Sequence, residues 1–209
     1  MRNIHILLID NYDSFTYNLQ HLLAVVPNVT LTVKRNDEDF LKELESGHYA
    51  GVVIGPGPGS PEDEHYFGFN KRVILDFGTK GLPILGVCLG FQGIYHCFGG
   101  QLKVANLPMH GKVSELQIEN NGLILQGIPN GARVMRYHSI MVDLEQTIPE
   151  CLECLAYTGM GLSQEWNGRE LMALEHKEHP IYGVQFHPES FATEYGKRVI
   201  ENFVNLCLN

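Results

Sequence analysis

The stretch Leu85-Gly86-Val87-Cys88-Leu89-Gly90-Phe91-Gln92 joins an apolar run to a helical pattern. Cys88 lies two residues after one glycine and two before another, which is the spacing of a nucleophile elbow. A strand that turns this sharply into a helix leaves no room for a side chain at either glycine. In an open α/β sheet, ligands bind beyond the carboxyl ends of the strands. The stretch therefore predicts an α/β fold in which Cys88 is exposed at a strand end, where the following helix favours its thiolate.

The first half of the chain alternates between strand-like and helical patterns. Continuous apolar runs predict buried parallel strands at Ile4–Ile9, Val29–Val33, Gly51–Ile54 and Leu82–Val87. Apolar spacing of helical type predicts helices from a Ser14 cap to Ala24, over Asp37–Ser46, over about Tyr66–Gly78, and from Cys88 to about Phe98. This order indicates an open, mainly parallel sheet with helices on both faces, as in flavodoxin-like proteins.

The second half shows shorter, alternating runs. They predict antiparallel strands, either added to the sheet or forming a small second one, at Val113–Ile118, Arg133–Val142, Leu152–Tyr157, Leu171–Glu175 and Ile181–Phe186. A last helix is expected over Glu194–Leu208. Because no linker or repeat interrupts the pattern, we expect residues 1–209 to form a single domain.

Composition narrows the class of protein. The chain has 209 residues, 44% hydrophobic and 19% charged, which is ordinary for a globular protein. A net charge of −9 argues against a nucleic-acid or anionic-membrane surface. The run Ile4–Ile9 is too short for a signal sequence or a membrane span, so a cytoplasmic location is expected.

The chain contains five cysteines, an odd number without the spacing of a disulfide framework, and they are expected to be reduced. Cys151-x-x-Cys154 has the spacing of half a zinc site. It lacks a second pair of ligands, so we expect two small buried hydrophobic residues there and no metal site.

A base and its orienting group follow the run Ile181–Phe186. His187 and Glu189 flank Pro188, which fixes the backbone between them. Taken alone, His-Pro-Glu is more typical of a surface turn. Its place at a strand end, together with the elbow cysteine, favours a Cys-His-Glu triad in which the imidazole is the base.

The loop Gly55–Pro61 alternates glycine and proline at another strand end. Its glycines allow the backbone to approach a ligand closely, and its prolines stiffen it. We expect the N–H groups of Gly57 and Leu89 to bind an oxyanion. The loop lacks the Gly-Lys-Ser/Thr ending of a phosphate-binding P-loop.

The motifs Val87–Gly93 and Gln185–Ser190 resemble the nucleophile and base motifs of the class I glutamine amidotransferase family, and the resemblance covers essentially the whole chain. It implies that Cys88 attacks the side-chain amide of L-glutamine, that His187 moves the proton and that Glu189 orients His187. It also implies a glutamine site at Gly57, Pro58, Gly59, Leu89, Gln92, Ser139 and Ile140. One departure is Phe91, where the family usually has histidine.

Other segments resemble the branch of that family that serves chorismate-aminating synthases: Asp10–Asn18, Tyr137-His138-Ser139 and His110-Gly111-Lys112. The resemblance implies a hetero-oligomer with a synthase large subunit, and no cofactor in this chain. Residues facing that partner would be Asn11, Tyr12, Asp13, Ser14, His110, Gly111 and Lys112. The tail Ala192–Gly196 favours anthranilate as the product over 4-amino-4-deoxychorismate.

Two other functions stay open at this point. The same fold could serve a stand-alone thiol hydrolase of γ-glutamyl compounds or peptides. A scaffolding subunit with an inactive site is the non-catalytic alternative. The partner-type segments weigh against the first of these, and the complete triad against the second.

Overall fold

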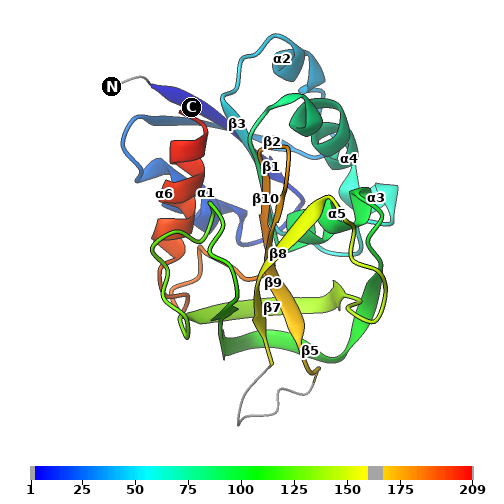
Figure 1. Cartoon of the computed structure of the whole chain (residues 1–209). Coiled ribbons are helices and arrows are strands. Elements are labelled where there is room, and N and C mark those ends of the chain that lie inside the picture. Colours follow the sequence, from blue (N-terminus) through cyan, green and yellow to red (C-terminus); the bar gives the residue numbers. More distant parts are fainter. Residues whose placement is uncertain (1–2, 160–166, 209) are drawn as a thin grey trace.

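The computed structural model describes residues 3–159 and 167–208. Within them an eight-stranded sheet runs in the order β2-β1-β3-β4-β10-β9-β8-β6, and β5 and β7 form a separate ribbon (Figure 1). The strands are β1 (Ile4–Asp10), β2 (Val29–Arg35), β3 (Gly51–Ile54), β4 (Ile84–Val87), β5 (Leu102–Glu115), β6 (Gln117–Ile118), β7 (Arg133–Val142), β8 (Leu152–Thr158), β9 (Glu170–His176) and β10 (Ile181–Val184). The helices are α1 (Thr16–Ala24), α2 (Leu41–Glu45), α3 (Glu64–Phe67), α4 (Asn70–Arg72), α5 (Leu89–Cys97) and α6 (Gly196–Leu206).

The parallel half of the sheet is buried on both faces. In β1, Ile6 and Leu8 pack into a core shared with α1 and α6. Leu7 and Ile9 alternate with them and pack into a second core with α2 and α5. Figure 1 shows α1 and α6 on one side of the sheet and α3, α4 and α5 on the other. This double burial is why the first strands read as unbroken apolar runs.

The antiparallel half begins at β10. That strand pairs parallel with β4 and antiparallel with β9, and β8 and β6 continue the sheet in antiparallel fashion. The expected mixed α/β architecture is confirmed. Both sequence-based alternatives for the second half occur together, since some strands extend the sheet while β5 and β7 form the separate ribbon.

Helix α1 starts later than predicted and is not capped by Ser14. Its first helical residue is Thr16, whose hydroxyl donates to the Asp10 carboxylate at 2.7 Å. The Phe15 N–H donates to Asp13 Oδ1, also at 2.7 Å. No side chain of the described residues caps α1, and the carboxylates of Asp10 and Asp13 instead fix the turn that precedes it.

The helix predicted over residues 66–78 is broken into short pieces. Helix α3 ends at Gly68, whose φ is +51° and which lies so close to the Asn36 carbonyl that a Cβ would clash with it. After α4, the chain continues as a π-helical turn, η1 (Val73–Phe77), and a 3₁₀ turn, η2 (Gly78–Lys80). The prediction of one helix was wrong because close packing of the chain at Gly68 overrides the apolar spacing.

Two other boundaries were wrong. The helix predicted over Asp37–Ser46 forms only as α2, which Gly47 follows with a φ of +69°. The strand predicted from Val113 starts much earlier as β5, since this ribbon strand is largely exposed and carries no strong apolar alternation.

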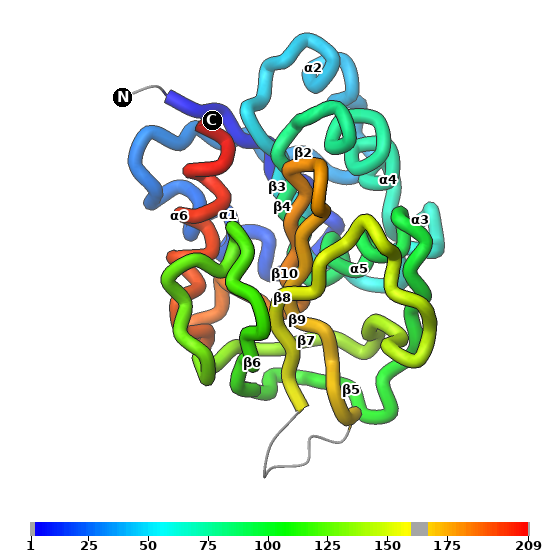
Figure 2. The backbone as a smooth tube through the Cα atoms, viewed as in Figure 1, coloured from blue at the N-terminus to red at the C-terminus, as the bar shows by residue number. Residues whose placement is uncertain are grey.

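The described ends of the chain lie at the same end of the molecule (Figure 2), where residues 3–5 and 207–208 border one surface hollow. No helix within the described residues is both long and apolar enough to cross a membrane.

Candidate functional site

The strand–helix turn holds Cys88 in a strained backbone conformation. Cys88 is the residue before α5 and has a φ of +55°, which non-glycine residues rarely adopt. A Cβ on Gly86 would lie 2.4 Å from the Gly90 carbonyl carbon, and a Cβ on Gly90 would lie 2.4 Å from the Ile54 carbonyl oxygen. The two glycines thus let β4, α5 and β3 approach closely enough to form the elbow.

Replacing Gly90 by alanine is expected to lower the free energy of unfolding by about 1–3 kcal/mol, because the new methyl group meets backbone that cannot rotate away. Urea denaturation measures the loss. Gly183→Ala is the control, since its Cβ would lie 3.1 Å from its nearest neighbour, a Phe91 ring carbon, rather than 2.4 Å from a backbone oxygen. An equal loss in both variants would contradict this account of the elbow.

The imidazole of His187 is bonded to the carboxylate of Glu189. The distance from Nδ1 to Oε1 is 2.6 Å, and the two side chains are 2% and 0% exposed. Burial by itself lowers the pKa of His187, but the Cys88 thiolate and the Glu189 carboxylate offset this and raise the pKa to about 10. His187 Nε2 is buried and has no hydrogen-bond partner within hydrogen-bond distance among the described residues. That nitrogen is therefore available to Cys88, and the structure brings the three predicted triad residues together.

Two aromatic rings hold the imidazole in place. The His187 ring is 5.6 Å from that of Phe15 and 5.2 Å from that of Tyr137, edge to face in both cases. The backbone N–H of His187 donates to the Met135 carbonyl at 3.0 Å, and the Thr193 hydroxyl donates to the backbone carbonyl of His187 at 2.6 Å. The base is thus fixed by contacts with the residue before α1, with β7 and with the loop before α6.

A cavity of about 190 Å³ opens beside the thiol. It is lined by Gly57, Pro58, Gly59, Cys88, Gln92, Tyr137, His138, Ser139 and Ile140. A Cβ on Gly57 would lie 2.7 Å from Leu89 Cδ2, so the oxyanion loop packs closely against the Leu89 side chain. Six of the seven sequence-predicted glutamine residues therefore line one cavity at the nucleophile, and the seventh, Leu89, is buried next to Cys88 and does not line it.

Gln92 contributes to this cavity chiefly by holding other groups. It is 3% exposed, and its Nε2 donates to the Ile140 carbonyl at 2.8 Å and to Gln185 Oε1 at 3.0 Å. The amide nitrogen therefore fastens the segment that contains Ile140. Phe91, where the family usually has histidine, is fully buried and packs against Gly183, outside the cavity.

The predicted partner-facing turn divides into buried and exposed parts. Asn11 is 1% exposed, and its Nδ2 donates to the Gly55 carbonyl at 2.7 Å. Its assignment to a partner surface was wrong, because its buried amide anchors the start of the oxyanion loop. Tyr12 and Ser14 are exposed, and Asp13 is half-buried.

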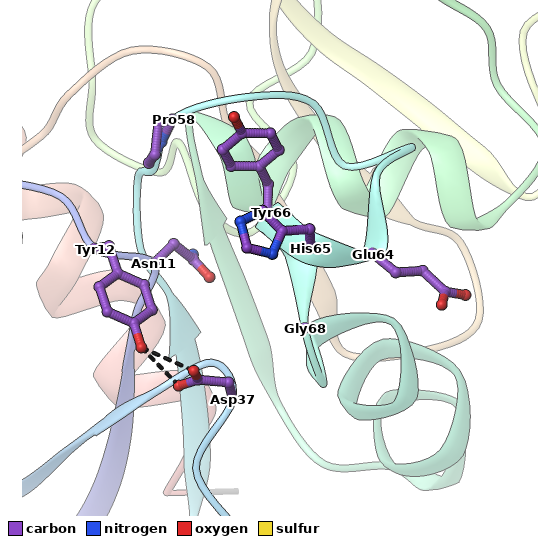
Figure 3. A pocket seen from close by; sticks show the side chains of 8 residues that line it. All are labelled: Asn11, Tyr12, Asp37, Pro58, Glu64, His65, Tyr66 and Gly68. Carbon is purple, nitrogen blue, oxygen red and sulfur yellow. Dashed lines mark hydrogen bonds between the residues drawn. The ribbon is translucent and has the colours of Figure 1, made fainter.

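Tyr12 and Asn11 border a second cavity, of about 500 Å³ (Figure 3). The Tyr12 hydroxyl donates to both carboxylate oxygens of Asp37, at 2.9 and 2.8 Å, and the ring of Tyr66 lies across from it. Pro58 lines this cavity as well as the smaller one. The larger cavity therefore adjoins the oxyanion loop but does not contain the thiol.

The other predicted partner segment lies on β5. His110 pairs with Tyr137 across the ribbon, and their rings are 6.1 Å apart. Gly111 has a φ of +67° within a register shift between His110 and Lys112. His110 thus lies close to Tyr137, whose ring also packs against the triad imidazole.

The five cysteines all fall within the described residues and are free thiols. Cys151 and Cys154 are half-buried rather than buried as expected, because they lie at and beside the start of β8 near the edge of the sheet. The described residues contain no cluster of three or more histidine, cysteine or acidic side chains arranged to hold a metal ion.

Sequence reasoning missed several residues that support the site. Phe15 was not singled out within the predicted helix from Ser14 to Ala24, and Gln185 was treated only as part of a motif. Arg136 and Glu170 were not singled out at all, although both are fully buried. The available signal was a charged residue at an inward position of an alternating strand, since such a residue needs a buried partner.

A mainly parallel sheet that presents a thiol beside a buried imidazole–carboxylate pair defines a thiol-dependent enzyme of the α/β class. The family model for glutamine amidotransferase class-I matches residues 7–207, and the chain belongs to that family.

Curated relatives agree with this assignment. The chain is 42% identical over 205 residues to anthranilate synthase component 2 of Leptospira biflexa, covering 96% of this chain and 98% of that protein. It is 41% identical over 209 residues to aminodeoxychorismate synthase of Streptomyces pristinaespiralis, of which it spans 27%. A solved glutamine amidotransferase from Thermotoga maritima aligns with a TM-score of 0.75 over 98% of this chain and 82% of its own, and at 17% identity it supports the fold alone.

Proposed function

We propose that this chain is the glutaminase subunit of a chorismate-aminating synthase, and that it hydrolyses L-glutamine through Cys88, His187 and Glu189. The observation that carries the proposal is the 190 Å³ cavity with the elbow thiol in its wall and the His187–Glu189 pair beside it. A thiol, a base and an orienting carboxylate in this order are what amide cleavage through a thioester needs.

The chemistry proceeds in two halves. The Cys88 sulfur attacks the side-chain carbonyl carbon of glutamine, and the N–H groups of Gly57 and Leu89 stabilise the resulting oxyanion. His187 holds the thiol proton on Nε2 and transfers it to the amide nitrogen, which leaves as ammonia. Water, deprotonated by His187, then attacks the γ-glutamyl thioester and releases glutamate and the free thiol.

The walls of the cavity would orient the rest of glutamine. Gly57, Pro58, Gly59, Ser139 and Ile140 all line it. Gln92 forms part of the same wall and ties Ile140 in place. These assignments follow from position beside the thiol, because a substrate amide at Cys88 must extend its amino-acid end along the cavity.

Exposed aromatic residues near the triad suit a partner surface. Phe191, two residues after Glu189, is 96% exposed, and Tyr17, two residues after Phe15, is 76% exposed. Large aromatic side chains left this open are enriched at protein interfaces. We infer that the synthase large subunit docks over this face, with Tyr12, Asp13, Ser14, His110, Gly111 and Lys112 also on the partner side, and receives ammonia in a hetero-oligomer.

Relatives named anthranilate synthase component 2 favour anthranilate as the product. The similarity to an aminodeoxychorismate synthase supports 4-amino-4-deoxychorismate as the second candidate. The choice lies with the partner, since the glutamine chemistry is the same in both. We propose a cytoplasmic, single-domain subunit that needs no cofactor of its own.

The test mixes the purified chain with an anthranilate synthase large subunit, chorismate and glutamine, and follows anthranilate fluorescence. A signal that depends on both glutamine and this chain is the expected result. If glutamine-dependent amination of chorismate occurs only with an aminodeoxychorismate synthase large subunit, followed as 4-amino-4-deoxychorismate, the second product is assigned. Glutamine hydrolysis that neither large subunit changes would instead favour a stand-alone γ-glutamyl hydrolase.

A further inference from the structure

The Ser139–Ile140 segment lies where the β5–β7 ribbon loses its regular pairing. His138 pairs with Met109 and Ile140 pairs with Val104, so β5 carries extra residues in a bulge opposite Ser139. A bulge leaves backbone groups without their ladder partners. Freed backbone at the cavity wall is useful for ligand binding, but the segment then needs anchors from elsewhere.

The side chains of Gln92 and His138 both anchor the segment at one atom, the Ile140 carbonyl oxygen. The Ile140 carbonyl accepts from Gln92 Nε2 at 2.8 Å and lies 3.0 Å from His138 Nδ1. A carbonyl oxygen can only accept, so a hydrogen bond there requires His138 to carry a proton on Nδ1. The position of Ile140 therefore depends on the tautomer of His138.

The second nitrogen of the imidazole, Nε2, lies beside a buried charged group. Arg136 Nε lies 3.3 Å from His138 Nε2, and arginine can only donate. Arg136 is fully buried, donates from Nη1 to the Ser114 hydroxyl at 2.8 Å, and forms an ion pair with Glu170. Glu170 is in turn bonded by Asn167 at 3.1 Å. This arrangement makes Nε2 an acceptor and leaves the single proton of a neutral ring on Nδ1.

The surroundings also keep the ring neutral. Burial and the adjacent Arg136 guanidinium lower the pKa of His138 to about 3, with a further lowering contribution from His187. The hydrogen bond to the Ile140 carbonyl opposes this lowering only in part. Glu170 Oε2 lies 3.6 Å from His138 Nε2, beyond hydrogen-bond distance, and has no hydrogen-bond partner within the described residues, while Oε1 is paired with Arg136. The imidazole therefore stays uncharged across the pH range in which enzymes operate.

We propose that His138 is a positioning residue for glutamine: Arg136 and Glu170 hold it as the Nδ1–H tautomer, and its Nδ1–H fixes the Ile140 carbonyl so that the Ser139–Ile140 backbone faces the substrate. The inference rests on the proposed glutaminase function. His138 acts through Ile140, and it takes no part in proton transfer at the thiol.

The kinetic test compares His138→Asn with His138→Gln. Asparagine places its amide nitrogen near the position of Nδ1, whereas the glutamine amide lies one carbon further out. His138→Gln is expected to raise KM for glutamine about tenfold, the effect of losing one hydrogen bond, with a smaller change in kcat. His138→Asn should recover most of this loss. His176→Gln is the matched control, because His176 is buried on β9 and bonds only the Glu178 and His179 N–H groups within the described residues.

Equal KM values for the two His138 variants, or a change confined to kcat, would overturn the positioning role. Nitrogen-15 NMR of the imidazoles gives a readout that needs no activity, with the His138 signals assigned by their absence in His138→Asn. A protonated Nδ1 and a bare Nε2 are expected between pH 6 and pH 9. A proton on Nε2 would overturn the tautomer assignment even in an active enzyme. An inactive wild-type chain with the expected tautomer would refute the glutaminase proposal instead.

Discussion

Cys88→Ala is expected to lower glutamine hydrolysis by at least about 10⁴-fold, because the thioester route is lost with the sulfur. The chain should still fold, since the thiol is only a weak hydrogen-bond donor, 3.9 Å from the Tyr137 carbonyl. Amination by the synthase with added ammonium should persist, because that reaction bypasses the glutaminase. Glutamate release and ammonium-dependent product formation are the two measurements.

The control is Cys97→Ala. Burial raises the pKa of the Cys97 thiol to about 12, so that sulfur stays protonated and unreactive, and its removal should leave hydrolysis close to the wild-type rate. A glutamine-like chloroketone should label Cys88 and no other cysteine. Loss of ammonium-dependent amination together with glutamine hydrolysis would show that Cys88 is needed for the structure or the complex rather than for the chemistry.

The elbow and the first strands could be predicted from the sequence because their causes are local. Gly86 is required by the backbone of Gly90 within one turn of Cys88, and the Gly-x-Cys-x-Gly spacing marks the elbow even though Gly90 itself meets Ile54 on β3. The double burial of β1 makes Ile4–Ile9 an unbroken apolar run. The pairing of His187 with Glu189 was predictable for the same reason, since only Pro188 separates them.

Features that depend on distant contacts could not be predicted. The break at Gly68 is set by the Asn36 carbonyl, a residue on the loop after β2. Asn11 was placed on the surface because nothing nearby in the sequence shows that the Gly55 carbonyl lies against its amide. The glutamine cavity itself was identified through a family resemblance, and the network behind it was not identified at all.

Arg136 shows what an alternating pattern can and cannot indicate. Val134, Arg136 and His138 share the inward face of β7, so the strand pattern alone places a guanidinium in the interior. The partner that makes this tolerable is Glu170, on β9. A charged residue at a buried position therefore predicts that a counter-charge exists, but which residue supplies that counter-charge depends on the tertiary fold.

Arg136→Met is accordingly expected to lower the free energy of unfolding by about 3–5 kcal/mol, because it leaves the Glu170 carboxylate buried without its counter-charge. Both side chains are 0% exposed, so water cannot replace the lost partner. The loss is a large share of the stability of a typical domain. Urea denaturation followed by circular dichroism measures it.

Two further variants separate the buried charge from loss of packing. Arg136→Met combined with Glu170→Leu removes both charges and should recover much of the stability, because a buried ion pair replaced by apolar side chains is often neutral in effect. Arg133 lies on the same strand as Arg136 and pairs with Glu194, and these two side chains are 63% and 41% exposed. Arg133→Met breaks this exposed pair and should have a much smaller effect. If the double variant is no more stable than Arg136→Met, the cost comes from the volume and bonds of the arginine, and the Glu170 charge is not its source.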